Sequence, residues 1–96
     1  MNTIGTIFQQ AVTAFEEGQL EAAKVLFRKI LSMQPKNGHA LLSLGVILAQ
    51  EGKPKKAYRH LHEANNLLPD SLDILINYGL VCLELKKNSR AKDLLE

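Results

Sequence analysis

Apolar residues recur along the chain at intervals of three and four, which is the spacing of one face of an α-helix. Between Asn37 and Asp70 this pattern forms two blocks, separated by the turn sequence QEGK and closed by Pro69. Gly52 interrupts the first block. Pro54 suits the first turn of a second helix, where its missing N–H would have no partner anyway. The pattern therefore predicts a pair of short amphipathic helices joined by a tight turn.

The same pattern returns when the chain is shifted by 34 residues in either direction. Upstream, the aligned positions are Ile7, Ala11, Ala14, Gly18, Ala23, Phe27, Ile30 and Pro35 against Leu41, Gly45, Leu48, Gly52, Ala57, Leu61, Ala64 and Pro69. Downstream, they are Leu75, Tyr78, Gly79, Cys82, Ala91 and Leu95 against Leu41, Leu44, Gly45, Leu48, Ala57 and Leu61. Two of these columns contain only small residues, as expected where helix axes cross closely. They are Ala11/Gly45/Gly79 and Ala23/Ala57/Ala91. A fixed period that carries a helix–turn–helix unit indicates a repeat protein.

On these columns the chain resembles a tetratricopeptide repeat (TPR) array of about two and three-quarter copies, over residues 4–96. The segment LLSLGVILAQEGKPKKAYRHLHEANNLLP matches the family pattern at nearly every column. Gln10 departs from the apolar column of Leu44 and Tyr78, and Lys86 replaces the turn glycine, so Asn88 is expected to help make the third turn. The resemblance implies an all-α fold, a TPR-like α-solenoid of antiparallel helix pairs in a right-handed superhelix, with about six helices.

We expect a single domain with repeats at about 4–37, 38–71 and 72–96, the last one truncated. The expected helices cover about 3–17, 20–33, 38–51, 54–68 and 71–85, and a sixth begins near Ser89. Candidate N-caps are Asn2 or Thr3, Asn37, and Asp70 or Ser71. Because residue 96 falls inside the last expected helix, we expect a fragment of a longer protein. Its open C-terminal end would leave Leu94 and Leu95 poorly covered and would recruit a partner, with a second copy of the chain as one candidate.

Composition narrows the possible functions. A chain of 96 residues with 46% hydrophobic content suits one small domain, and a net charge of +2 is too small to argue for a nucleic-acid partner. No stretch approaches the ~20 apolar residues of a membrane span, and the N-terminus lacks a signal-peptide pattern. A cytoplasmic location is therefore expected. The single cysteine, Cys82, excludes an internal disulfide and is expected to pack in the core, in the column of Ala14 and Leu48.

No residue pattern predicts catalysis, a metal site or a cofactor. His60 and His62 are two residues apart and point in different directions on a helix, while His39 has no ligand partner in its own unit. Nucleophile motifs and phosphate loops are missing from the sequence. Basic residues gather at Lys53, Lys55, Lys56 and Arg59 and at Lys86, Lys87, Arg90 and Lys92. Because few aromatic residues interleave with them, we interpret them as a solvated convex surface and not as a nucleic-acid platform.

In TPR arrays the first helices of successive units line a concave groove that holds a peptide or a partner helix. The positions of this chain that match the groove are apolar in three columns: Phe8/Leu42/Ile76, Val12/Val46/Leu80 and Phe15/Ala49/Leu83. These residues do not lie on the helix face that packs against the other helix of the same repeat, so a different partner has to bury them. That partner is either an amphipathic helix or extended peptide, or the neighbouring units themselves.

A fourth column, Gln9/Ser43/Asn77, is polar in all three units. It resembles the asparagine ladder of the O-linked N-acetylglucosamine transferase arrays, although only Asn77 matches that ladder outright. An amide at this place can donate to and accept from a peptide backbone. Ordinary polarity of a helix surface is the alternative explanation.

The resemblance argues against one class of ligand. Chaperone-binding relatives hold a terminal carboxylate with lysine, asparagine and arginine, whereas the matching positions here are Phe8, Val12, Ser43, Asp73 and Asn77. Without cations, a carboxylate would have no charge-assisted partner, so chaperone tails are not expected to bind in that way.

We therefore predict a non-catalytic protein–protein interaction module. Its expected groove residues are Phe8, Gln9, Val12, Phe15, Leu42, Ser43, Val46, Ile76, Asn77 and Leu80. Two alternatives stay open: the targeting or scaffold arm of a larger enzyme such as a glycosyltransferase or methyltransferase, and a self-assembling scaffold.

Overall fold

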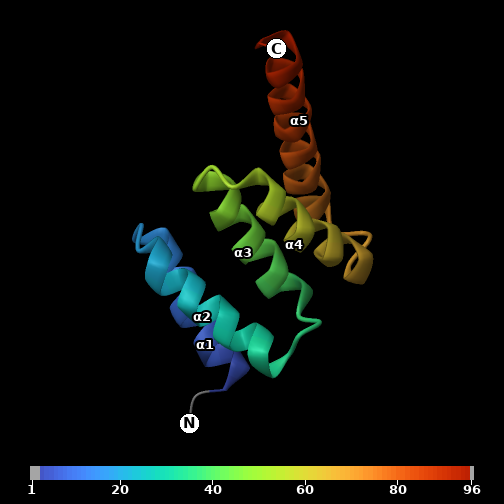
Figure 1. Ribbon diagram of the computed structural model, residues 1–96. Coiled ribbons are helices and arrows are strands. Elements are labelled where there is room, and N and C mark those ends of the chain that lie inside the picture. The colour runs from blue at the N-terminus through green and yellow to red at the C-terminus, as the bar shows by residue number, and fades with distance from the viewer. Residues whose placement is uncertain (1–2, 96) are drawn as a thin grey trace.

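The chain forms five helices in a computed structural model that describes the backbone of residues 3–95 and the side chains of residues 3–89. They are α1 (Ile4–Glu16), α2 (Leu20–Met33), α3 (Gly38–Gln50), α4 (Pro54–Leu67) and α5 (Leu72–Leu95). Consecutive helices pack against one another in an elongated array of 55 × 28 × 20 Å (Figure 1). The predicted all-α solenoid is confirmed. No described helix has both the length and the apolar character that a bilayer crossing requires.

The starts of three helices are capped by the predicted side chains. Thr3 Oγ1 accepts a hydrogen bond from the Thr6 N–H at 3.2 Å, and Asn37 Oδ1 accepts one from the Ala40 N–H at 2.9 Å. At α5 the Ser71 hydroxyl accepts a longer bond of 3.4 Å from the Ile74 N–H. These bonds satisfy backbone donors that have no partner inside the helix. The candidate cap Asn2 lies outside the described residues.

The first two turns depend on glycines in the left-handed region of backbone space. Gly18 has φ +78° and Gly52 has φ +75°. After α1 the Gly18 N–H donates to the Phe15 carbonyl and the Gln19 N–H donates to the Ala14 carbonyl at 2.8 Å. The same pair of bonds follows α3. This Schellman arrangement satisfies the last carbonyls of each helix and reverses the chain.

The predicted third turn is not formed. Lys86 stands at the position of Gly18 and Gly52, and a side chain disfavours the left-handed conformation that this turn requires. Instead, α5 runs as one helix from Leu72 to Leu95, and its C-terminal part extends beyond the other four helices (Figure 1). The predictions of a sixth helix from Ser89 and of a turn at Asn88 are therefore wrong for this chain.

The predicted core columns are buried throughout the first two repeats. The buried apolar residues there are Ile7, Ala11, Ala14, Ala23, Phe27, Ile30, Leu41, Leu44, Leu48, Ala57, Leu61 and Ala64. The helices α3 and α4 approach closely at Gly45, where an added Cβ would lie 2.8 Å from Leu61 Cγ. In the first two repeats, Ala11 and Gly45 therefore have the packing role that the sequence predicts for their column.

The third repeat is buried on a different face. Leu75 is 45% exposed, Cys82 is exposed, and nothing lies within 4 Å of a Cβ built on Gly79. The prediction that Cys82 packs in the core is wrong, because no second helix among the described residues covers this side of α5. Among the side chains of α5 that the structure describes, the buried ones are Ile74 and Val81, which occupy the columns of Ala40 and Ile47 one repeat earlier. Thus α5 packs through the face that contacts the preceding repeat.

One buried lysine joins the first repeat to the second. Lys24 is 4% exposed, and its Nζ lies 2.8 Å from Glu21 and 2.9 Å from Glu51 at the end of α3. Hydrogen bonds to Glu21 and then to Glu51 raise the pKa of Lys24 above its usual range. Because its charge is satisfied on both sides, this lysine can be buried where the two units meet.

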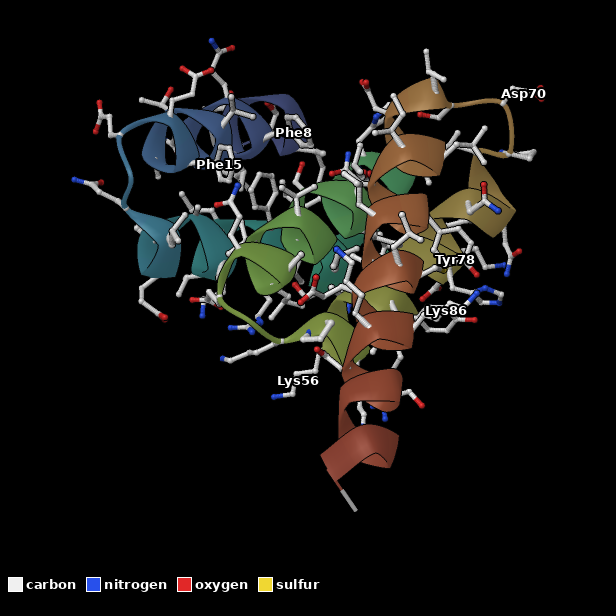
Figure 2. All side chains as sticks on the ribbon, turned by 90° about the horizontal axis from the view of Figure 1, so that it is seen from above. Phe8, Phe15, Lys56, Asp70, Tyr78 and Lys86 are labelled. Carbon is white, nitrogen blue, oxygen red and sulfur yellow. The ribbon has the colours of Figure 1, made fainter. Side chains whose placement is uncertain are left out.

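Three aromatic rings join α4 to α5. Tyr58 stacks on His62, and Tyr78 reaches both from α5, with its ring centroid 5.4 Å from that of Tyr58 (Figure 2). The Tyr78 hydroxyl lies 2.7 Å from His62 Nδ1 and donates to the Tyr58 hydroxyl at 3.4 Å. His62 is exposed but also takes part in this contact.

We predict a late tyrosine ionisation step. The hydrogen bond with Tyr58, together with burial, raises the pKa of Tyr78 to about 12, whereas an unfolded tyrosine ionises near pH ~10. Because the folded pKa is the higher one, stability contributed by neutral Tyr78 is complete below pH ~10 and is lost as the pH rises toward 12. In an alkaline absorbance titration, the wild type should show a late step that Tyr78→Phe removes. A wild-type curve without this step would contradict the Tyr58–Tyr78 bond.

Candidate peptide-binding groove

A first hollow of about 360 Å³ lies where α1, α2, α3 and α5 meet. Its lining combines apolar and polar side chains: Val12, Phe15, Glu16, Phe27, Leu42, Ser43, Val46, Asp73 and Asn77. Phe15 comes from the second half of α1, downstream of Phe8 on the same helix (Figure 2). Behind the hollow, the Phe8 and Phe27 rings meet edge to face with centroids 5.6 Å apart. This contact holds the ring of Phe27, which is buried and lines the hollow, in place.

A second hollow of about 350 Å³ continues along α3 and α5. Its lining is Val46, Ala49, Gln50, Gly52, Pro54, Leu61, Asn77, Leu80, Val81, Glu84 and Asn88. Val46 and Asn77 line both hollows, so the two are adjacent. We call the two hollows together the groove. Its length along two helices suits a peptide segment better than a compact small molecule.

The charged groups that line the groove are carboxylates. Asn77 Nδ2 donates to the Asp73 carbonyl at 2.8 Å, which leaves the amide oxygen and the second amide N–H of Asn77 to meet a ligand. Three carboxylates line the hollows, from Glu16, Asp73 and Glu84. Among the described side chains that line the groove, none is lysine, arginine or histidine. Such a surface favours a ligand that carries hydrogen-bond donors and positive charge.

Two of these carboxylates, those of Asp73 and Glu16, lie at helix ends of opposite polarity: Asp73 at a helix start and Glu16 at a helix end. Asp73 lies in the first turn of α5, where a negative charge stabilises the helix. Glu16 is the last residue of α1, where a negative charge is unfavourable by ~0.3–1 kcal/mol. Its position therefore gives Glu16 no helix-stabilising role.

The structure brings together seven of the ten predicted groove residues. They are Val12, Phe15, Leu42, Ser43, Val46, Asn77 and Leu80. The other three line neither hollow. Phe8 packs on Phe27 and lines a separate shallow hollow with Ile4 and His39, Gln9 is exposed on α1, and Ile76 is 51% exposed on α5.

Sequence reasoning did not assign Glu16, Glu84 or Asn88 to the groove. The columns were chosen for hydrophobicity, and these polar residues lie beside the apolar columns on the same helices. The signal that could have found them is the spacing of four residues: Val12 to Glu16, and Leu80 to Glu84 and on to Asn88. Among the described residues, no group of three histidine, cysteine or acidic side chains could hold a metal ion.

Comparison with known proteins agrees with this architecture. The family model for subunit 3 of the anaphase-promoting complex, or cyclosome, matches residues 8–96. The protein O-mannosyl-transferase TMTC3 of Homo sapiens is 35% identical over 75 residues, which is 78% of this chain and 8% of that protein. The Mus musculus protein of the same name is 35% identical over 71 residues, again 8% of its length. The chain thus spans a small part of these relatives. Because the family model matches residues 8–96 and the chain forms TPR-type helix pairs, the chain belongs to the anaphase-promoting complex subunit 3 family of repeat domains.

Proposed function

We propose that this chain is a non-catalytic protein-interaction module whose groove binds an apolar peptide segment or amphipathic helix that carries lysine or arginine. The observation that carries the proposal is the pair of adjacent hollows that form the groove, apolar at Val12, Phe15, Val46 and Leu80, together with its carboxylates. Apolar side chains of the ligand would enter the two hollows, and its cations would meet the three carboxylates of the groove. A cytoplasmic location is part of this proposal.

Selection from a library of random peptides tests the proposal. Peptides enriched on the wild type should combine apolar residues with lysine or arginine. Leu80→Glu places a further charge on the apolar wall and should weaken each selected peptide by ~10-fold or more. Because Leu80 is 59% exposed, this variant should keep the melting temperature of the wild type. Acidic selected peptides, or equal affinity for Leu80→Glu, would contradict the proposal.

We predict a separate role for Glu16 in charge recognition. Glu16→Gln removes an exposed carboxylate from an unfavourable helix end, so the free energy of unfolding should stay the same or rise slightly. Affinity for the selected cationic peptides should fall, and its dependence on salt should become shallower. Glu17→Gln, one residue away and outside the groove lining, is the matched control. Equal effects of the two substitutions on binding would exclude a specific contact with Glu16.

A second candidate is the targeting arm of a larger enzyme. It is favoured by the likeness to the two O-mannosyl-transferases, of which the chain matches 8%. In that case the groove would hold a substrate protein for a catalytic domain elsewhere in the same polypeptide. The two candidates differ in whether the gene's reading frame encodes a non-repeat catalytic domain beside this array.

A further inference from the structure

Cationic side chains gather on the exposed sides of α2 and α4. The groove is lined mainly by α1, α3 and α5, so these sides form a second surface of the array. We call it the outward face and define it by seven exposed residues, none of which lines either hollow of the groove. They are Val25, Arg28, Lys29 and Met33 on α2 and Lys55, Lys56 and Arg59 on α4.

The outward face is open inside the array and not only at its ends. Arg59 and Glu63 on α4 occupy the columns of Val25 and Lys29 on α2. The second repeat packs against α2 on one side and against α5 on the other, yet Arg59 and Glu63 are both exposed. Neighbouring repeats therefore leave these columns accessible to a partner.

Two large apolar side chains lie among the cations of α2. Val25 is 62% exposed and Met33 is 51% exposed, and the other large exposed apolar residues of the described part of the chain are all on α5. Val25, Lys29 and Met33 are spaced by four residues, so they form one strip along the helix. The buried Phe27 and Ile30 occupy the other side of α2, where the core lies. A partner that covers the strip must accept apolar and cationic groups together.

Positive charge dominates the outward face. Its five cationic residues are accompanied by two exposed carboxylates on the same helices, those of Glu21 and Glu63. Glu21 Oε1 lies 2.8 Å from Lys24 Nζ, so this carboxylate is already paired. Lys55 and Lys56 lie in the first turn of α4, where a positive charge is unfavourable for the helix. Helix stability therefore does not explain their position.

The groove and the outward face carry opposite charge. Glu16, Asp73 and Glu84 line the groove. Lys56 projects from the start of α4, away from Phe15 of α1 (Figure 2). An anionic surface would attract the outward face and repel the groove, so the molecule would bind it with the groove turned away.

Anionic phospholipid provides both kinds of group that the outward face requires. Its headgroup phosphates pair with lysine and arginine, and the boundary between headgroups and acyl chains accepts apolar side chains. Nucleic acid also offers phosphates, but its bases stack on aromatic rings, and the seven residues of the outward face include none. The mixed strip on α2 therefore favours a lipid surface.

We propose that the outward face of α2 and α4 binds the surface of a membrane that contains anionic phospholipid. The lysine and arginine side chains contact lipid phosphates, while Val25 and Met33 enter the headgroup region. The contact is peripheral, with no helix entering the bilayer core. The groove stays open to water, so this binding does not depend on the proposed peptide ligand.

Sedimentation with lipid vesicles tests the proposal. The wild type should bind vesicles of phosphatidylcholine mixed with phosphatidylserine at least ~10-fold more tightly than vesicles of phosphatidylcholine alone. High salt should release it from the mixed vesicles. Lys29→Glu combined with Arg59→Glu should weaken this binding by ~10-fold or more. Both side chains are exposed, so the melting temperature should not change.

Lys86→Glu combined with Lys87→Glu is the matched control for total charge. It makes the same change in net charge at exposed positions of α5 and should bind the mixed vesicles like the wild type. An equal loss in the two double variants would show that binding follows net charge, and would overturn the outward face as the site. A wild type that binds neither kind of vesicle, or both equally, would overturn the proposal itself.

A third double variant separates the bilayer from an acidic protein or a nucleic acid. Val25→Ser combined with Met33→Ser keeps every charge and should still weaken vesicle binding by ~3-fold or more, because the apolar side chains no longer enter the headgroup region. Unchanged binding would show that charge alone makes the contact, and would overturn the assignment to lipid.

A fluorescent label tests the orientation. In a Cys82→Ser background, a polarity-sensitive dye is attached at Val25→Cys or, on α1, at the exposed position of Gln9→Cys. On mixed vesicles the dye at residue 25 should move to shorter wavelength, and the dye at residue 9 should not. Equal shifts at the two positions would overturn the orientation with the outward face on the membrane.

Discussion

Gly45→Leu is expected to destabilise the fold by ~1–3 kcal/mol or more. An added Cβ at this position would lie 2.8 Å from Leu61 Cγ, 3.1 Å from Leu61 Cδ2 and 3.5 Å from the Ala57 carbonyl oxygen. Leu61 is completely buried and cannot move aside without disturbing its neighbours. Chemical denaturation should show the loss as a lower midpoint, and thermal melting as a fall of ~4–8 °C for each kcal/mol.

Gly79→Leu is the matched control, because Gly79 stands in the same column one repeat later. Nothing lies within 4 Å of its added Cβ, and leucine is a better helix former than glycine by ~0.5–1 kcal/mol. This variant should be as stable as the wild type or slightly more stable. If the two variants lose equal stability, the assignment of a covered α3 face and an uncovered α5 face is wrong.

Phe27→Ala should have the largest effect of any single truncation, ~3–5 kcal/mol. Phe27 is 1% exposed in the core, meets Phe8 edge to face, and lines the first hollow of the groove. Removing the ring leaves a cavity between α1 and α2 that the small neighbours Ala11 and Ala23 cannot fill. Since small domains are stable by only ~5–15 kcal/mol, the first repeat should be partly unfolded in this variant.

Phe27→Leu separates packing from groove function. It keeps most of the buried volume, so its loss of stability should be clearly smaller than that of Phe27→Ala. Hydrogen exchange in Phe27→Ala should increase first in α1 and α2. Exchange that increases uniformly through α5 would show that the array unfolds as one cooperative unit, contrary to a solenoid in which each repeat contacts its neighbours.

The sequence predicts most of the fold because the 34-residue period repeats the turn residues and helix starts as well as the apolar core positions. It places the glycines of the first two turns, the proline at the start of α4 and the caps of α1 and α3, and those four helices begin and end within one residue of the expected positions. The third repeat follows the period at Gly79 and Cys82 but loses the turn glycine to Lys86. Residue 86 then decides between a turn and a continuous helix. In an alignment of the repeats this position is only one column among many, so its importance does not stand out.

The candidate groove was predicted less completely. Periodicity identifies which residues share a helix face, and it found the apolar wall from Val12 to Leu80. It does not show how far neighbouring units cover that wall, so it placed Phe8 in the groove when the ring packs on Phe27. The acidic character of the groove also depends on which turns of α1 and α5 come together, because Glu16 lies on α1 and both Asp73 and Glu84 lie on α5. That information lies in the packing and not in any one repeat.

The most direct test of the groove is an NMR titration of the isotope-labelled chain with a selected cationic peptide. The account predicts that backbone amide shifts concentrate at Val12, Val46, Asn77 and Leu80, and that Glu16→Gln reduces them at a given peptide concentration. The proposed function would be contradicted if the shifts concentrated elsewhere. Such places are the exposed face of α5 around Leu75 and Leu83 and the exposed surfaces of α2 and α4.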